Sequence, residues 1–294
     1  MMQDLTAKLC LGTVQLGMKY GVKNELGRQP TDEEAFSVLD AALAAGITAF
    51  DTARAYGTAE ELLGRFGLAE KGAHIVSKLH PNTANREEAV LSELHESLQS
   101  LRAKKIFCYM LHRAGDLQKS GIMAGLSKAK ALGLTKTIGV SIYEPEEAME
   151  AALHPLVDVI QIPYNVLDQR LDACGFFLQA AKNGKRVYAR SAFLQGLLLM
   201  SPQEAEASVS GSGVFVSKFQ DIARKEGYMN TEAAMLYVLS HPQIDGVIFG
   251  VDTVEQLREN VKILKRGEEF SSCRKQFRRS FENVPREVVV PSLW

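Results

Sequence analysis

The stretch TAFDTARAYG (residues 48–57) sets the pattern from which the fold can be inferred. Its apolar run closes on Asp51, and Tyr56 follows in the next loop. Two later segments end in the same way, because HIVSK closes on Lys78 and FCYMLH closes on His112. In a parallel α/β barrel, the active site is built where strands give way to loops at their carboxyl ends. These four side chains are therefore candidates for one catalytic site.

Short apolar segments alternate with amphipathic ones along the chain, as in repeated βαβ units. We expect eight strands, at residues 9–13, 48–51, 75–78, 107–112, 137–141, 158–161, 186–190 and 246–249. Eight such units fill 294 residues without a linker. We therefore predict an α/β fold, a (β/α)8 TIM barrel, as a single domain over residues 1–294. The alternative, a doubly wound sheet, would normally place a G-x-G-x-x-G turn after its first strand, where this chain has LGTVQLG.

Three segments carry clear helix signals. Thr31 and Glu34 form a Thr-x-x-Glu capping box, and Gly46 supplies a stop for the helix that they begin. Leucines at helical spacing mark a second helix from Asn85, and residues 254–264 form another apolar stripe. This last stripe predicts a C-terminal helix that is followed by a tail.

The gap between the seventh and eighth strands is longer than the others. Residues 191–217 carry several glycines and a polar centre, which is typical of a long loop. We predict that this loop is a lid over a bound cofactor. A mobile insertion without that role is the alternative.

Composition and charge limit the classes of function. A formal net charge of −1 gives no global reason to expect nucleic acid or an anionic membrane as a partner. The four cysteines share no C-x-x-C spacing, so we assign no metal site and expect reduced thiols. With no signal-peptide pattern and no long apolar run, we expect a soluble, cytoplasmic protein. The basic stretch at residues 258–279 is either a solvated helical face or an attraction for a phosphorylated ligand.

The four candidate side chains suit the reduction of a carbonyl group. The product alcohol needs a hydride at carbon and a proton at oxygen, and a tyrosine beside a cation can give that proton. Lys78 would be the cation, Asp51 would hold it in place, and His112 could orient the substrate oxygen. Each of the four, taken alone, is more often a packed or solvated residue. Their shared position at strand ends favours a joint role.

The segment FDTARAYGTAE (residues 50–60) resembles the Asp-Thr-Ala-x-x-Tyr-Gly signature of the aldo-keto reductases. GVS (residues 139–141) and QIPYN (residues 161–165) look like the strand-five and strand-six motifs of that family. The resemblance covers most of the chain and implies a barrel that binds a nicotinamide dinucleotide without a Rossmann fold. It also implies a catalytic tetrad of Asp51, Tyr56, Lys78 and His112.

The same resemblance indicates which residues would bind the cofactor. Ser141 and Gln161 match positions that hydrogen-bond the nicotinamide carboxamide. Arg190 replaces an aromatic ring that commonly stacks on the nicotinamide, and its planar guanidinium can also stack. The remaining matches follow strands seven and eight: Ser191, Phe193, Gln195, Gly196, Gly250, Val251, Asp252, Gln256 and Asn260. Tyr20 lies in the loop after strand one, where the family has part of its substrate pocket.

The choice between NADP(H) and NAD(H) is less sharply indicated. Many members of the family use NADP(H), which favours that cofactor. In this chain, however, Asp252 would repel a 2′-phosphate, and Gln256 stands where many members have arginine. Arg258 and Lys262 are close enough in sequence to supply positive charge. We expect NADP(H) ahead of NAD(H) by a small margin.

Three functions are compatible with the sequence. A reductase of small aldehydes, ketones or aldoses fits best. Ile142, Arg190 and Gln256 depart from the family pattern and would suit a nicotinamide-nucleotide-binding accessory or sensor protein with little turnover. A lyase or isomerase that uses Lys78 as a Schiff base would leave Asp51 and Tyr56 unexplained. No cluster of arginines marks an acidic substrate, and the physiological substrate, the oligomeric state and the role of the C-terminal tail are left open.

Overall fold

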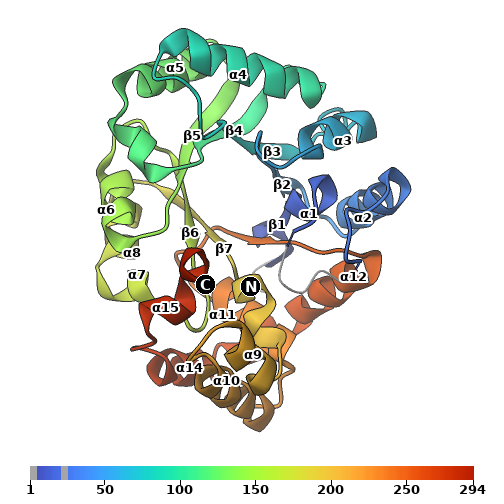
Figure 1. Cartoon of the computed structure of the whole chain (residues 1–294), viewed down its shortest axis with the longest axis vertical. Coiled ribbons are helices and arrows are strands. Elements are labelled where there is room, and N and C mark those ends of the chain that lie inside the picture. Colours follow the sequence, from blue (N-terminus) through green and yellow to red (C-terminus); the bar gives the residue numbers. More distant parts are fainter. Residues whose placement is uncertain (1–4, 21–25) are drawn as a thin grey trace.

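The computed structural model describes residues 5–20 and 26–294, and these form a closed barrel of eight parallel strands surrounded by helices (Figure 1). The strands are β1 (Leu9–Gly12), β2 (Ala49–Asp51), β3 (His74–Lys78), β4 (Ile106–Leu111), β5 (Thr135–Ser141), β6 (Val159–Pro163), β7 (Arg186–Arg190) and β8 (Gly246–Phe249). The ring closes at β1, where Cys10 lies opposite Ala49 of β2 and Ile248 of β8. The predicted (β/α)8 TIM barrel is confirmed.

The predicted strands agree with the observed ones except at their ends. β7 and β8 have the predicted bounds, and the other strands differ by one or two residues at one or both ends. Strand ends are the part of a strand that an apolar pattern defines least. One difference affects the site: β4 ends at Leu111, so His112 belongs to the following loop.

Helices connect the strands and cover the outside of the barrel. They are α1 (Val14–Gly17), α2 (Asp32–Ala44), α3 (Ala59–Phe66), α4 (Glu87–Ser100), α5 (Ser120–Ala131), α6 (Pro145–Leu153), α7 (Arg170–Ala173), α8 (Phe176–Lys182), α9 (Pro202–Ser208), α10 (Gly213–Lys225), α11 (Asn230–Leu239), α12 (Val254–Ile263), α13 (Gly267–Phe270), α14 (Arg274–Ser280) and α15 (Arg286–Val289). Short 3-10 turns are η1 (Leu5–Lys8), η2 (Ala114–Gln118), η3 (Leu194–Leu199), η4 (Leu264–Arg266) and η5 (Pro291–Leu293).

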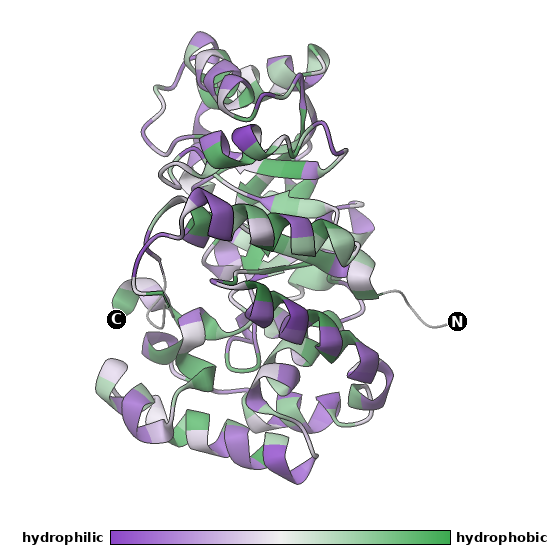
Figure 2. Cartoon of the chain, turned by 90° about the vertical axis from the view of Figure 1, so that its right-hand side faces the viewer, coloured by the Kyte–Doolittle hydropathy of each residue, from purple (hydrophilic) through white to green (hydrophobic). Residues whose placement is uncertain are grey.

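Hydropathy follows this layering. Hydrophobic residues concentrate on the strands and hydrophilic ones on the outer helices (Figure 2). Along residues 5–20 and 26–294, we find no helix whose length and apolar character would let it span a bilayer.

Helix α2 begins as its capping signal predicts. The Thr31 hydroxyl accepts a hydrogen bond from the Glu34 N–H, and the Glu34 carboxylate accepts one from the Thr31 N–H at 2.7 Å. The chain then turns at Gly46, where φ is 83°. Because both ends are fixed locally, α2 leads the chain into β2 in a defined register.

The prediction of a long loop after strand seven is wrong in part, because much of that segment is helical. Residues 191–217 contain η3, all of α9 and the start of α10. Helix α9 begins with a capping box in which the Ser201 hydroxyl accepts from the Glu204 N–H, with Pro202 in its first turn. These short helix signals were hidden among glycines and serines that suggested a loop. Residues 191–217 are therefore largely helical and form part of the barrel rim.

The interior of the barrel is filled with side chains. A cluster of buried residues occupies it: Cys10, Val76, Cys108, Met110, Val159, Tyr188 and Ile248. A larger cluster fills the space between the strands and the helices. The barrel is therefore a packed core, and open space is left at one rim.

Candidate active site

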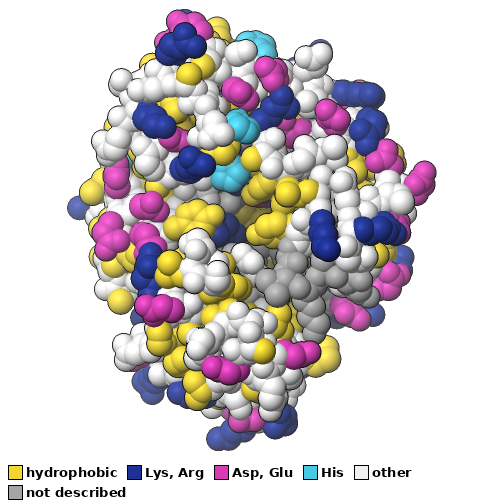
Figure 3. Space-filling view, viewed as in Figure 1, with side chains coloured by type: hydrophobic (Ala, Val, Ile, Leu, Met, Phe, Trp, Pro, Cys, Tyr) yellow, Lys and Arg dark blue, Asp and Glu magenta, His cyan; other side chains and the backbone are white. Residues whose placement is uncertain are grey.

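A cavity of about 490 Å³ opens at the carboxyl ends of the strands. Figure 3 shows a hollow near the centre of this face, edged by hydrophobic and histidine side chains. Asp51, Tyr56 and His112 line the cavity, and Lys78 lies behind Asp51 with only 1% of its surface exposed. The structure thus brings the four predicted catalytic residues together.

Lys78 and Asp51 form a buried ion pair at the ends of β3 and β2. The Lys78 Nζ lies 2.6 Å from Asp51 Oδ1 and also donates to the Thr52 carbonyl oxygen at 2.9 Å. Burial lowers the pKa of Lys78, but its interactions with Asp51 and Tyr56 outweigh burial, so the pKa stands above its ordinary value. Lys78 is therefore a fixed cation.

Tyr56 faces this cation and His112. The Lys78 Nζ lies 4.9 Å from the centre of the Tyr56 ring. The Tyr56 and His112 rings meet edge to face, with centres 5.8 Å apart. The phenol ring of Tyr56 therefore lies between a buried ammonium group and an imidazole at the cavity wall.

The segment that carries Tyr56 packs against the end of α1 without space between the two backbones. A Cβ atom at Gly17 would lie 2.1 Å from the Tyr56 carbonyl oxygen, and one at Gly57 would lie 2.3 Å from the Gly17 carbonyl oxygen. The Gly17 carbonyl oxygen accepts hydrogen bonds from the Thr58 N–H at 3.1 Å and from its hydroxyl at 3.3 Å. The backbone position of Tyr56 is thereby tied to the connection between β1 and α2.

His112 is neutral at physiological pH. Burial, and then the positive charges of Lys78, Arg190 and Arg113, lower the pKa of His112 from 6.5 to about 4. Its Nδ1 atom is buried without a hydrogen-bond partner among residues 5–20 and 26–294. A neutral imidazole can donate from one nitrogen to a substrate oxygen without adding charge to the site.

This low pKa predicts an acid-sensitive contribution to stability. As the pH falls below 6.5, the unfolded chain protonates His112 while the folded chain resists until about pH 4. The contribution is therefore intact above pH 6.5 and is lost between pH 6.5 and pH 4. In urea unfolding at pH 7.5 and pH 5, we expect wild type to lose about 1–2 kcal/mol more than His112→Gln. Equal losses for the two proteins would contradict the assignment of a neutral His112.

Gln161 joins the catalytic group from β6. Its Nε2 donates to Asp51 Oδ2 at 2.8 Å, opposite the oxygen that binds Lys78. The amide nitrogen is thus engaged by Asp51, and the carbonyl oxygen is the acceptor that Gln161 can offer to a ligand. Ser141, at the end of the neighbouring strand β5, also lines the cavity.

The segment after β7 forms another wall. Ser191, Phe193, Gln195 and Gly196 line the cavity. Ser191, Leu194 and Gln195 have φ values of 64°, 48° and 52°, which are uncommon for residues other than glycine. Such backbone strain is concentrated at binding sites and clamps, so this wall has the character of a ligand-binding loop.

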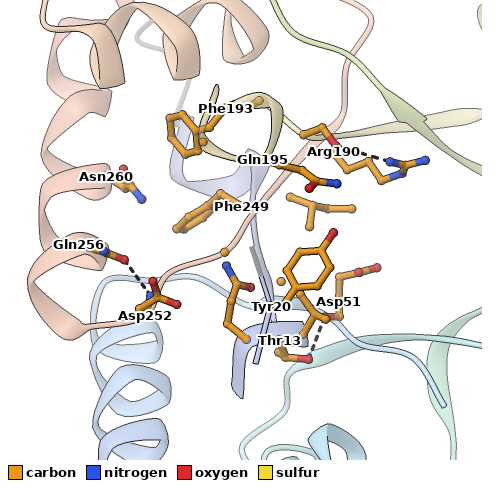
Figure 4. A pocket seen from close by; sticks show the side chains of 18 of the residues that line it. Thr13, Tyr20, Asp51, Arg190, Phe193, Gln195, Phe249, Asp252, Gln256 and Asn260 are labelled. Atoms are coloured by element: carbon orange, nitrogen blue, oxygen red, sulfur yellow. Dashed lines mark hydrogen bonds between the residues drawn. The ribbon is translucent and has the colours of Figure 1, made fainter. Parts of the chain in front are cut away.

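The start of α12 forms the far end of the cavity. Asp252, Gln256 and Asn260 line it, and the Asp252 N–H donates to Gln256 Oε1 at 2.8 Å. In Figure 4 these three side chains lie on one side, Arg190 and Asp51 lie on the other, and Phe249 stands between them. Gly250 is also on the wall, whereas Val251 is buried and does not line the cavity.

Arg190 stacks on a protein side chain. Its guanidinium carbon lies 4.3 Å from the centre of the Tyr143 ring, and its Nη2 donates to the Ile142 carbonyl oxygen at 3.0 Å. Tyr143 follows β5, two residues after Ser141, and is 43% exposed. Arg190 and Tyr143 therefore form one wall of the cavity near Tyr56.

Several cavity residues carry no recognisable sequence signal. The connection after β1 contributes Gly12, Thr13, Val14 and Gln15, and other elements contribute Tyr143, Ala192, Leu199, Thr231, Ile248, Phe249 and Glu259. Thr13 supports the site because its hydroxyl donates to the Asp51 carbonyl oxygen at 3.0 Å. The LGTVQLG stretch contains no motif that would predict a place in the site. Tyr20, the predicted substrate residue, does line the cavity.

The C-terminal tail is anchored beside the same rim. Arg286 binds Glu144 at 2.5 Å, and Glu144 also pairs with Arg170 at 2.9 Å. Arg170 in turn donates to the Tyr143 carbonyl oxygen at 3.2 Å. The tail is thus connected to the wall formed by Tyr143.

Known proteins resemble this chain over most of its length. The uncharacterized oxidoreductase YqkF of Bacillus subtilis (strain 168) is 26% identical over 78% of this chain and 81% of its own. A D-threo-aldose 1-dehydrogenase of a Pseudomonas species is 26% identical over 83% of this chain and 87% of its own. The solved structure of aldo-keto reductase AKR11C1 from Bacillus halodurans (holo form) has 18% identity and a TM-score of 0.76, covering 92% of this chain and 91% of that one.

Fold and relatives together define an oxidoreductase built on a (β/α)8 barrel. The model of the aldo/keto reductase family matches residues 8–275, and the chain belongs to that family. The family acts on carbonyl compounds and generally binds NAD(P)H.

Proposed function

We propose that this protein reduces an aldehyde, ketone or aldose to an alcohol with NADPH, and that Tyr56 donates the proton. The observation that carries the proposal is the contact of Tyr56 with the buried Lys78–Asp51 pair and with neutral His112 at the cavity. A single cytoplasmic domain that acts on a small-molecule carbonyl substrate is the corresponding expectation for the whole chain.

The protein's own part in the reaction is the transfer and control of one proton. When bound, the cofactor supplies the hydride to the carbonyl carbon. Tyr56 gives its hydroxyl proton to the carbonyl oxygen, and Lys78 stabilises the phenolate that is left. Asp51 keeps the ammonium group in place, and His112 donates a hydrogen bond to the same oxygen. Solvent then returns a proton to Tyr56.

The size and the lining of the cavity support a dinucleotide as its ligand. Its volume of about 490 Å³ is within the usual range for small-molecule sites. At Gly250 a Cβ atom would lie 2.2 Å from the Gln15 amide, so the Gly250 backbone and the Gln15 side chain are close neighbours on the cavity wall. Ser141 and Gln161 would hold the carboxamide end. The segment after β7 and the start of α12 would hold the phosphates and the adenosine end.

NADPH is proposed ahead of NADH, with a small difference between them. Family habit supports NADPH, but the far end of the cavity carries the carboxylates of Asp252 and Glu259. Arg258, which could offset them, is 67% exposed and lies 3.9 Å from Glu255. Titration of each cofactor, followed by thermal unfolding, tests both binding and preference, since a ligand of the folded state raises the melting temperature.

Removal of the Asp252 charge should increase the preference for NADPH. A nearby carboxylate disfavours an added phosphate by about 1 kcal/mol, which is roughly fivefold in affinity. We expect Asp252→Asn to raise the ratio of the NADH to the NADPH dissociation constant by roughly that factor. Glu282→Gln removes an exposed charge that does not line the cavity and is the matched control. An unchanged ratio in Asp252→Asn would place the 2′-phosphate elsewhere.

A second candidate function is a nicotinamide-nucleotide-binding sensor or accessory protein. It is favoured by Arg190, which stacks on Tyr143 where the family has a ring for the nicotinamide. The two functions differ in one measurement: a sensor binds NADPH or NADH but reduces no member of a broad panel of aldehydes, ketones and aldoses.

A further inference from the structure

We propose that the carbonyl substrate carries a carboxylate or a similar small anionic group, and that Arg190 binds this group at the catalytic end of the cavity. The inference rests on the proposed reductase function and adds a substrate class to it. The substrates would be oxo acids or carboxylated aldehydes rather than neutral carbonyl compounds.

Arg190 is a half-buried cation without an acidic partner. Lys78 pairs with Asp51, and Arg170 pairs with Asp168 and Glu144. Within residues 5–20 and 26–294, in contrast, no carboxylate lies within ion-pair distance of Arg190. Burying a charge in part without a counter-ion is unfavourable, so a cation of this kind on a cavity wall is suited to an anionic ligand.

The guanidinium of Arg190 is held in a defined orientation. Tyr143 packs on its face at 4.3 Å, and the Ile142 carbonyl oxygen accepts from Nη2 at 3.0 Å. A stacked guanidinium presents its remaining N–H groups at its edge, in the geometry that binds both oxygens of a carboxylate. The Ile142 contact also sets the guanidinium apart from a freely rotating surface arginine.

The position of Arg190 links it to the reacting carbonyl. It lines the same cavity as Tyr20, Tyr56 and His112, on the side opposite Asp252 (Figure 4). Its positive charge contributes to the low pKa of His112, as does exposed Arg113. The catalytic end is therefore positive and the Asp252 end negative, which separates the proposed anion site from the adenosine end of the cofactor. Because Arg113 and Arg190 are distant in sequence, the sequence itself shows no arginine cluster.

The test compares acids with their neutral esters. Glyoxylate, succinic semialdehyde and para-carboxybenzaldehyde, which differ in the spacing of carbonyl and carboxylate, are each measured against their methyl esters. For at least one pair we expect wild type to favour the acid in kcat/KM by about tenfold or more, as charge-assisted hydrogen bonds do. Arg190→Gln should lower the ratio of kcat/KM for that acid to kcat/KM for its ester about 10-fold. Arg190→Lys keeps the positive charge but loses the two parallel N–H donors of the guanidinium. Its preference for the acid should lie between those of wild type and Arg190→Gln.

Controls separate the anion site from other roles of Arg190. Arg224→Gln removes a 77% exposed arginine of α10 and should leave the acid-to-ester ratio unchanged. The dissociation constant of NADPH is measured separately in Arg190→Gln, because Arg190 also stands at the position that the family resemblance assigns to the nicotinamide. If Arg190→Gln weakens NADPH binding and slows acid and ester alike, Arg190 serves the cofactor and the inference is wrong. An absence of acid preference in wild type also overturns it.

A binding measurement without turnover distinguishes failure of the proposed reductase function from failure of the proposed anion site. If no carbonyl is reduced, the proposed function fails, and thermal stabilisation by benzoate is compared with that by neutral benzamide. Stabilisation by benzoate that disappears in Arg190→Gln supports the anion site, whereas equal effects in the two proteins refute it.

Discussion

Replacement of Tyr56 by phenylalanine should lower kcat for carbonyl reduction roughly 10²- to 10⁴-fold, the usual contribution of a general acid. The substitution removes one hydroxyl and keeps the ring that packs edge to face on His112. NADPH affinity and the melting temperature should therefore change little. Single-turnover oxidation of bound NADPH, with hydride transfer rate-limiting, measures the loss directly.

A matched control tests whether loss of any tyrosine hydroxyl would have this effect. Tyr228 packs under Arg266 on the outer helices and does not line the cavity. Tyr228→Phe should retain wild-type kcat. If Tyr56→Phe reduces carbonyls as fast as wild type, another group supplies the proton and the proposed mechanism is wrong.

The second large effect is expected at Lys78. In Lys78→Met, Asp51 would remain buried, with 4% of its surface exposed, and without its cation. Loss of one partner of a buried ion pair typically costs 3–5 kcal/mol, roughly, in the free energy of unfolding. Turnover should fall as well, because nothing would then stabilise the Tyr56 phenolate. Urea unfolding and kcat are the two measurements.

The double variant Asp51→Asn/Lys78→Met separates the two losses. It removes both charges, so a large part of the lost stability should return while turnover stays low. Lys130→Met provides the surface comparison, because its pair with Asp158 is 41% and 33% exposed and should be worth less than about 1 kcal/mol. Recovery of turnover in the double variant would exclude Lys78 from the chemistry.

The barrel and the meeting of the four catalytic candidates could be predicted because both depend on the ends of short apolar strands. Asp51 and Lys78 close their strands, and a parallel barrel places all such ends at one rim. The ion pair follows from that topology, although its distance does not. Proton donation by Tyr56 and the cofactor contacts stay predictions.

Other parts of the site depend on contacts between distant segments. The stacking of Arg190 on Tyr143 joins β7 to the loop after β5. No hydrophobic periodicity or motif around either residue predicts that contact. Thr13 acts through a hydroxyl group that donates to the Asp51 carbonyl oxygen, and such a contact leaves no charged signal in the sequence. Helix α9 is not predictable from the local composition, because glycines and serines surround the capping box at Ser201.

The contact between Gly17 and Gly57 has a consequence for the cost of each reaction cycle. There is no room for even a methyl group between the two backbones. The backbone that carries the phenol of Tyr56 is therefore restrained in position. The conformational entropy of placing the acid is then lost once, when the chain folds, and is not lost again in every turnover. A larger residue at either glycine would act on the barrier to reaction while touching none of the reacting atoms.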